Sequence, residues 1–333
     1  MRLTTKQWIQ VILSMAIAIW IFWFLYKDIS FRSLQNALRE TSLFWMLASV
    51  IISLLGFYLR AWRWKILIIA SEKSELKTSV TFAGLMIGYL ANLLVPRAGE
   101  VVRCGAVSKM NDNQVGTLVG TVVVERTIDL LFMLLTVFLG FLLEREMFLS
   151  LISDLVSTES LLNKLLGMLP VVIGGGLITV IFLYLLFQKY RESNLIKKVR
   201  HFIRDLVSGI FSLRKVENQW GFWGSSVAIW VIYYITMIFV AWAIPSTASL
   251  SLGAILMVMV MGSIGMLAPV QGGIGTFHAL VAFILMAYGL SNEEGKIFAV
   301  IIHSVQVLTV VVLGMACLGY FFKITSDKTS KSL

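Results

Sequence analysis

Long, uninterrupted runs of apolar residues recur along the whole chain and constrain its fold more than any other feature. A helix needs about 20 such residues to cross a bilayer. Transmembrane β-barrels need short alternating segments instead, so the continuous runs exclude them. Hydrophobic residues make up 58% of the 333 residues and charged residues only 14%, which excludes a disordered chain and a soluble globule. The sequence therefore predicts an all-α polytopic membrane protein.

About six of these runs are long enough to be full spans. The first is predicted to be an uncleaved N-terminal anchor, because it is long for a signal peptide and no cleavage site follows it. The predicted spans are Trp8–Tyr26, Leu43–Leu59, Gly116–Leu143, Met168–Phe187, Phe222–Ile244 and Ile297–Phe322. Two further apolar regions, Val80–Met110 and Ser251–Leu290, are interrupted by Pro and Gly. Each half of them has about 15–17 residues, which is short for a crossing of roughly 30 Å.

Charged loops orient the spans through the positive-inside rule. Basic residues gather in Arg60–Ser79, in Gln188–Trp220 and after Phe322, which places these segments and both termini in the cytoplasm. Glu144–Gly167 is acidic and is predicted to lie outside. The net charge of +10 is typical of loops that face anionic lipid, so we expect no nucleic-acid partner. The expected location is the cell inner membrane.

In this orientation each interrupted region begins and ends on one side of the membrane. Arg60–Ser79 and Asn111 are both cytoplasmic, whereas Ser249 and Asn292 are both external. The chain then contains two repeats of span, re-entrant helical hairpin and span, with reversed orientation. Inverted repeats with broken helices are a recurring transporter design. The charge pattern equally allows each region to cross as a pair of thin helices, which would give eight to ten short spans.

The remaining segments complete a single integral membrane domain. Leu195–Leu213 has one apolar and one basic face, which predicts an amphipathic helix on the inner leaflet. Trp62 and Trp64, beside Arg60 and Arg63, are predicted interfacial anchors. The predicted parts are 1–42 (anchor and external segment), 43–143 (first repeat), 144–221 (linking span and amphipathic helix), 222–322 (second repeat) and 323–333 (cytoplasmic tail).

Charged residues at the break of the first hairpin predict an anion site. If a helix restarts at the proline of this break, Arg97, Glu100 and Arg103 share one face. The helix start offers free N–H donors, Gly99 permits close backbone approach, and guanidinium groups add donors that match phosphate. Asn92, one turn before the break, adds a polar contact.

Three more charged residues, Glu125, Arg126 and Asp129, lie inside the predicted span Gly116–Leu143. Glu125 lies roughly 14 Å into the bilayer. Charges at this depth are costly, so we expect them to pair with the charges of the first hairpin or to line a watery cavity. The three acids and three bases of the two segments have no net charge. They form either a purely structural ion-pair network or a substrate or proton path.

The break of the second hairpin predicts non-helical backbone, because Gly272, Gly273 and Gly275 follow Gln271. Such backbone is tolerated at this depth only where it lines protein or a cavity. A helix start after these glycines would give a second anion site that faces the first from the opposite leaflet. His278 is predicted either to bind phosphate or to be a hydrogen-bonded structural histidine.

His303, in the last span, is assigned to the intramembrane network as a residue that hydrogen-bonds between helices. The sequence contains no catalytic constellation, no metal-ligand cluster and no nucleotide-binding loop. We therefore expect a protein that is not an enzyme and uses no cofactor and no metal.

Three motifs occur in an order that resembles a known family. They are Asn92–Arg103 (NLLVPRAGEVVR), Glu125–Asp129 (ERTID) and Pro269–Gly275 (PVQGGIG). Through them the chain resembles, over nearly its whole length, the lysylphosphatidylglycerol synthase transmembrane (flippase-like) family. That family forms the membrane half of enzymes that make and translocate aminoacylated phosphatidylglycerol, and many stand-alone proteins. The resemblance implies lipid translocation by a stand-alone member. His278 departs from it, because many members carry an acidic residue there.

The leading hypothesis is a passive or ion-coupled flippase for a phosphate-bearing lipid, whose headgroup slides between the two hairpin tips. Membrane phospholipids are the expected partners, and homo-oligomerisation is left open. The alternative is a membrane-embedded transferase that uses a lipid-phosphate donor, with Glu125 or Asp129 as the base. A third hypothesis is a membrane scaffold with a structural charge network.

Overall fold

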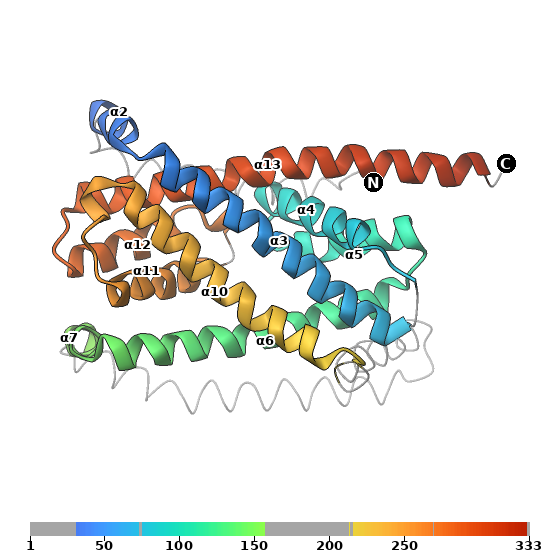
Figure 1. Cartoon of the computed structure of the whole chain (residues 1–333), viewed down its shortest axis with the longest axis horizontal. Coiled ribbons are helices and arrows are strands. Elements are labelled where there is room, and N and C mark those ends of the chain that lie inside the picture. Colours follow the sequence, from blue (N-terminus) through green and yellow to red (C-terminus); the bar gives the residue numbers. More distant parts are fainter. Residues whose placement is uncertain (1–30, 73–74, 157–212, 214–215, 269, 332–333) are drawn as a thin grey trace, which may run out of the picture.

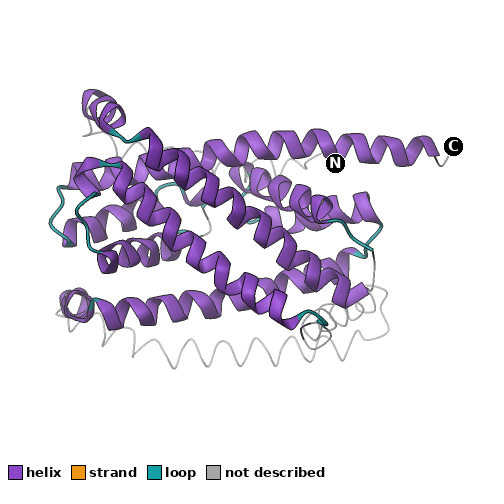
Figure 2. Ribbon diagram, in the orientation of Figure 1, coloured by secondary structure: helices purple, strands orange, loops and turns teal. Residues whose placement is uncertain are grey.

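The computed structural model describes residues 31–72, 75–156, 213, 216–268 and 270–331, in which all regular structure is helical (Figures 1 and 2). Helices satisfy their own backbone hydrogen bonds, as apolar segments in a bilayer require. Four of them are long and apolar enough to cross a membrane: α3 (Leu43–Glu72), α6 (Val115–Leu143), α10 (Gln219–Ala243) and α13 (Asn292–Lys331). The prediction of an all-α polytopic membrane protein is confirmed.

The four long helices correspond to four of the six predicted spans. The other two, Trp8–Tyr26 and Met168–Phe187, lie outside the described residues. The predicted amphipathic helix Leu195–Leu213 also lies outside them, apart from its last residue. Helix α13 continues beyond Phe322 to Lys331, so the described part of the predicted tail is helical.

Helix α3 is longer than predicted, which corrects the assignment of its last third. The predicted span ended at Leu59 and left Arg60 and Arg63 in a cytoplasmic loop, but the helix continues unbroken to Glu72. Both arginines are buried, and Trp64 is buried completely instead of lying at the membrane surface. The helix continues because a second apolar run follows the arginines, whose charges find partners inside the protein.

Two helical hairpins lie between the long helices. The first consists of α4 (Thr78–Leu94) and α5 (Gly99–Asn111), and the second of α11 (Leu252–Gly265) and α12 (Thr276–Ala287) with the short 3₁₀ turn η3 (Gln271–Gly273) between them. The longest of these helices, α4, has 17 residues. At 1.5 Å per residue it spans roughly 26 Å, less than the apolar core of about 30 Å.

The two hairpins occupy opposite ends of the helix bundle. In Figure 1, α4 and α5 lie in the right half, and α11 and α12 lie in the left half. Both outer ends of the first hairpin lie together, because Asn111 Nδ2 donates a hydrogen bond to the carbonyl of Glu75 at 3.2 Å. The tips meet between the two ends, where Gln271 Nε2 donates to the carbonyl of Leu94 at 3.0 Å. This geometry is that of two opposed hairpins and not of successive thin spans.

The long helices give the two halves opposite chain directions. Helices α3 and α10 are antiparallel, since Ser42 N donates to the Ala243 carbonyl near one end and Arg63 Nη1 donates to Ser226 Oγ near the other. The first half therefore consists of α3, a hairpin and α6, and the second of α10, a hairpin and α13, in the reverse direction (Figure 1). This is the arrangement of an inverted repeat.

Each hairpin packs against the closing helix of the other half. Gly314 of α13 lies against Met86 and Leu90 of α4, and Gly140 of α6 lies against Met257 of α11. Small residues at these crossings let the helices approach closely, as is common between membrane helices. The two halves are therefore interlocked and do not form separate bodies.

The apolar core follows this arrangement. One cluster lies among α10, α11, α12 and α13, and another among α3, α4, α5 and α6. Two short helices, α2 (Phe31–Glu40) and α7 (Arg145–Val156), contact the first cluster through Leu34, Ala37 and Phe148. Both hairpins thus contribute side chains to the core.

Close packing inside the first hairpin makes Gly88 sensitive to substitution. A Cβ atom at Gly88 would lie 2.8 Å from the carbonyl oxygen of Gly99, whereas a Cβ atom at Gly105 would meet nothing within 4 Å. We expect Gly88→Ala to reduce stability by about 1–3 kcal/mol. Gly105→Ala should leave it unchanged or raise it by up to about 1 kcal/mol, because Ala favours helix. Thermal unfolding in detergent measures both, and equal midpoints would contradict the packing described.

Cysteine labelling in sealed vesicles tests the opposed hairpins. In a Cys104→Ser, Cys317→Ser background, single cysteines are placed at exposed positions that flank the hairpins, namely Lys77 and Lys109 for the first and Ser249 and Asn292 for the second. We expect Lys77→Cys and Lys109→Cys to label from one side only, and the other two from the opposite side only. Labelling of the two members of one pair from opposite sides would contradict a hairpin, because both outer ends of a hairpin must lie on the same side.

Candidate functional site

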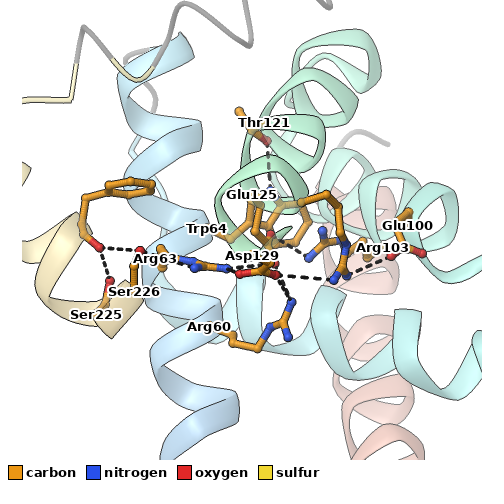
Figure 3. Close-up of polar contacts among 12 residues, drawn as sticks. Arg60, Arg63, Trp64, Glu100, Arg103, Thr121, Glu125, Asp129, Ser225 and Ser226 are labelled. Carbon is orange, nitrogen blue, oxygen red and sulfur yellow. Dashed lines mark hydrogen bonds and ion pairs between the residues drawn. The ribbon is translucent and has the colours of Figure 1, made fainter. Parts of the chain in front are cut away.

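Seven charged side chains from three helices meet inside the bundle and form what we call the charge network (Figure 3). Spacings of three or four residues place Arg60 with Arg63, Glu100 with Arg103, and Glu125 with Asp129 on one face of their helices. The members are Arg60 and Arg63 from α3, Glu100 and Arg103 from α5, and Glu125, Arg126 and Asp129 from α6.

Glu125 is the centre of the network, and its side chain is completely buried. Its Oε1 lies 3.0 Å from Arg60 Nη2 and 3.6 Å from Arg63 Nη2, and its Oε2 lies 3.0 Å from Arg103 Nη1. Three guanidinium groups therefore surround one carboxylate. Removing a single member of a buried group of this kind leaves uncompensated charge, which is strongly destabilising.

Asp129, one turn further along α6, also binds several arginines. Its Oδ1 lies 2.6 Å from Arg63 Nη2, and its Oδ2 lies 2.9 Å from Arg60 Nη2 and 3.5 Å from Arg126 Nη1. The two acids of α6 therefore hold both arginines of α3. This explains why charged residues are tolerated in the middle of an otherwise apolar helix.

The outer edge of the network is more open than its centre. Arg126 Nη2 lies 2.8 Å from Glu100 Oε1, and the side chains of this pair are 40% and 26% exposed. The side chain of Arg103 is 2% exposed and that of Arg63 is fully buried. The network thus presents one accessible ion pair and keeps its other charges inside.

Aromatic and hydroxyl groups complete the surroundings of the arginines. The Arg103 guanidinium lies 4.6 Å from the centre of the Trp64 ring, and Trp64 Nε1 donates to Thr121 Oγ1 at 3.0 Å. Arg60 Nη1 donates to Tyr233 Oη of α10 at 2.6 Å. All four helices α3, α5, α6 and α10 therefore contribute to fixing the positions of the guanidinium groups.

Arg97 is not a member of this network, contrary to the prediction that it shares a face with Glu100 and Arg103. Helix α5 begins only at Gly99, and Arg97 has a left-handed backbone with φ of 61°. Its guanidinium donates to the carbonyl of Leu267 at the tip of the second hairpin. The predicted set of three acids and three bases is therefore wrong, because Arg60 and Arg63 take the place of Arg97.

The predicted anion site at the start of α5 is partly occupied by the protein itself. Asn92 Oδ1 accepts the backbone N–H of Gly99 at 2.7 Å, and the N–H of Ala98 is bonded to the carbonyl of Val95. Asn92 therefore caps the helix, as side-chain oxygens commonly do at helix starts.

The second tip has the predicted non-helical backbone. Gly272, Gly273 and Gly275 have φ values of 56°, 77° and 91°, a region that favours glycine. Helix α12 begins after them, and His278 Nδ1 accepts the N–H of Gly275 at 3.3 Å. Gln271 is buried and joins the first hairpin. The predicted second anion site is thus also partly capped from within.

His303 belongs to this second hairpin region and not to the charge network. Its ring lies 4.7 Å from that of His278 and 5.4 Å from that of Phe277. Neither ring nitrogen of His303 has a hydrogen-bond partner among the described residues. Among the described residues, His303 therefore makes ring contacts with α12 and not the predicted interhelical hydrogen bond.

Comparison with known proteins places this geometry in a family. The sequence model of one family, described as the lysylphosphatidylglycerol synthase TM region, matches residues 11–314. The chain belongs to this family. No curated protein and no solved structure matches it. The matched range contains all three sequence motifs and the whole charge network.

As a member of the lysylphosphatidylglycerol synthase TM family, the chain is a multi-pass membrane protein with a role related to membrane lipids. Among its described residues, no group of three or more His, Cys, Asp or Glu side chains could hold a metal ion. The polar centre of this family member is built from arginine–carboxylate pairs.

The site contains three residues that the sequence did not predict as parts of it, namely Arg60, Arg63 and Tyr233. The two arginines carried a usable signal, because they are three residues apart and a second apolar run follows them before the next turn. Tyr233 carried none, since tyrosine is ordinary in membrane helices. Its role depends on how α10 packs against α3.

Removal of Glu125 tests the centre of the charge network. We expect Glu125→Ala to lower the free energy of unfolding by about 3–5 kcal/mol, because three guanidinium groups lose a shared partner. Glu100→Ala is the matched control, and it should cost about 0–1 kcal/mol, because its ion pair with Arg126 is partly exposed. Denaturant unfolding in mixed micelles measures both. A similar cost for the two variants would show that burial does not set the importance of these pairs.

Proposed function

We propose that the chain translocates a phosphate-bearing lipid of the phospholipid type across the inner membrane. The contact between the two hairpin tips is the observation that carries this proposal. Gln271 donates to the carbonyl of Leu94, and Arg97 donates to the carbonyl of Leu267. Hydrogen bonds of this kind contribute only about 1 kcal/mol each. The tips are therefore suited to open and close around a headgroup.

A lipid phosphate would compete for Arg97. The guanidinium now donates to a neutral carbonyl, whereas charge-assisted hydrogen bonds to phosphate are roughly twice as strong as neutral ones. Arg97 is exposed, so a headgroup can reach it. Binding of the phosphate would release the carbonyl of Leu267 and loosen the contact between the tips, and the substrate itself would open its path.

The charge network would supply the next polar groups along the path. A headgroup that enters the hydrocarbon region needs polar partners at that depth. The accessible pair of Arg126 and Glu100 offers a donor for phosphate and an acceptor for a cationic headgroup. Family membership supports phosphatidylglycerol or its aminoacylated form as the lipid class.

Charges at the two ends of the bundle support an orientation. The outer ends of the first hairpin carry Lys77 and Lys109 beside Glu75, and those of the second carry Glu293 and Glu294 beside Lys296. The positive-inside rule favours a cytoplasmic location for the basic end. Both termini would then be cytoplasmic, as the sequence predicts.

The alternative of a transferase with Glu125 or Asp129 as the base receives less support. Every carboxylate oxygen of the two residues is already within ion-pair distance of an arginine. Glu125 is also fully buried, and both of its oxygens are engaged by arginines. These contacts fit positioning and charge compensation better than proton abstraction.

Reconstitution tests the proposal with phosphatidylglycerol labelled on its acyl chain. In proteoliposomes, the wild type should let dithionite reduce the fluorophore of both leaflets, whereas protein-free liposomes should lose only the outer half. Arg97→Gln should slow translocation roughly tenfold or more, because Gln keeps a donor for the carbonyl of Leu267 but loses the charge that phosphate needs.

Arg145→Gln is the control for this experiment, because it removes an exposed charge far from the tips. It should translocate at the wild-type rate. If the wild type leaves inner-leaflet lipid unreduced, the proposed function is wrong. If the wild type translocates lipid and Arg97→Gln does so at the same rate, Arg97 is not a headgroup ligand.

A further inference from the structure

The charge network carries one more positive charge than negative charges. Among the described residues it combines four arginines with three carboxylates, and the outer pair of Arg126 and Glu100 is neutral by itself. The buried part is left with Arg60, Arg63 and Arg103 against Glu125 and Asp129, an excess of one positive charge. Uncompensated charge is costly at membrane depth, so an excess of this kind calls for an anion.

Arg103 is the arginine with donors available for that anion. Its Nη1 lies 3.0 Å from Glu125 Oε2, but its Nε and Nη2 have no hydrogen-bond partner among the described residues. These two nitrogens form one edge of the guanidinium plane, with both N–H groups pointing the same way. This edge matches two oxygens of a phosphate group.

The position of this edge is fixed by its surroundings. The Trp64 ring lies against the guanidinium at 4.6 Å, and Trp64 is itself held by its hydrogen bond to Thr121. The side chain of Arg103 is 2% exposed, so its unpartnered donors are enclosed by protein. Arg60 and Arg63 differ, because both of their terminal nitrogens have partners.

We propose that the Nε–Nη2 edge of Arg103 binds a monoanionic phosphodiester in a bidentate manner. One negative charge neutralises the excess of the network, whereas a doubly charged phosphate would overcompensate it. The accessible pair of Arg126 and Glu100 lies on α6 and α5, the helices that carry Glu125 and Arg103. In this proposal the anion reaches Arg103 past this pair. The proposed Arg103 site rests on the proposed function only in taking the phosphate to be that of a lipid. Free phosphate in its monoanionic form offers the same chemistry.

Native mass spectrometry of the full-length chain in detergent tests this site with defined probes. The wild type is titrated with phosphatidylglycerol, with diacylglycerol of the same chains and with inorganic phosphate. We expect phosphatidylglycerol to bind the wild type. Arg103→Lys should weaken this binding about tenfold, because Lys keeps the charge but lacks the paired Nε and Nη2 donors. Arg145→Lys, at an exposed position outside the network, should bind as the wild type does.

The probes separate the two sources of phosphate. Competition by inorganic phosphate at the Arg103-dependent site would assign it to free phosphate, whereas no competition would assign it to the lipid headgroup; either result supports an oxyanion site. Equal binding by Arg103→Lys and wild type, or equal binding of diacylglycerol, would overturn the proposal. Thermal unfolding of Arg103→Lys confirms that the variant is folded, as expected from its retained charge beside Glu125.

This test is independent of the translocation assay. Arg103-dependent binding without lipid movement by the wild type would keep the anion site and remove the proposed function. Lipid movement by the wild type, together with normal lipid binding by Arg103→Lys, would keep the proposed function and remove the anion site.

Discussion

The burial of Glu125 among three arginines is the interaction on which the rest of the structure depends. Arg60 and Arg63 come from α3 and Arg103 comes from α5, so one carboxylate of α6 links three helices. Each of these charges would be costly alone in a bilayer, and together they are tolerated. The register of α3, α5 and α6 is thereby set by charge pairing, and the position of the first hairpin follows from it.

The broad architecture could be predicted from the sequence because Pro and Gly divide the apolar regions Val80–Met110 and Ser251–Leu290 into halves. These halves are short for a bilayer crossing, and loop charges indicated on which side each region begins and ends. The full length of α3 was missed, although a second apolar run follows the two arginines. An arginine that ends an apolar run looks the same whether it reaches water or, like Arg60 and Arg63, a buried carboxylate.

The candidate site was predictable in part, for a related reason. Glu100, Arg103, Glu125, Arg126 and Asp129 were recognisable because charged residues stand out at membrane depth, and the structure brings them together. Arg97 and His303 were wrongly assigned to the charge network. Their actual neighbours depend on where α5 begins and on contacts between helices that are far apart in the sequence. Asn92 accepts a hydrogen bond from the first residue of α5, Gly99, and spacing along the chain does not reveal this contact.

The crossed packing of the hairpins has a consequence for how the chain matures during synthesis. Leu90 of α4 finds its partner Gly314 of α13 only after 314 − 90 = 224 further residues have been made. Contacts between residues so far apart in sequence form late and slowly. The face of α4 that carries Met86 and Leu90 must therefore be covered by lipid or by the insertion machinery until the last helix arrives. Quality control that recognises an uncovered hairpin would then detect every incomplete chain.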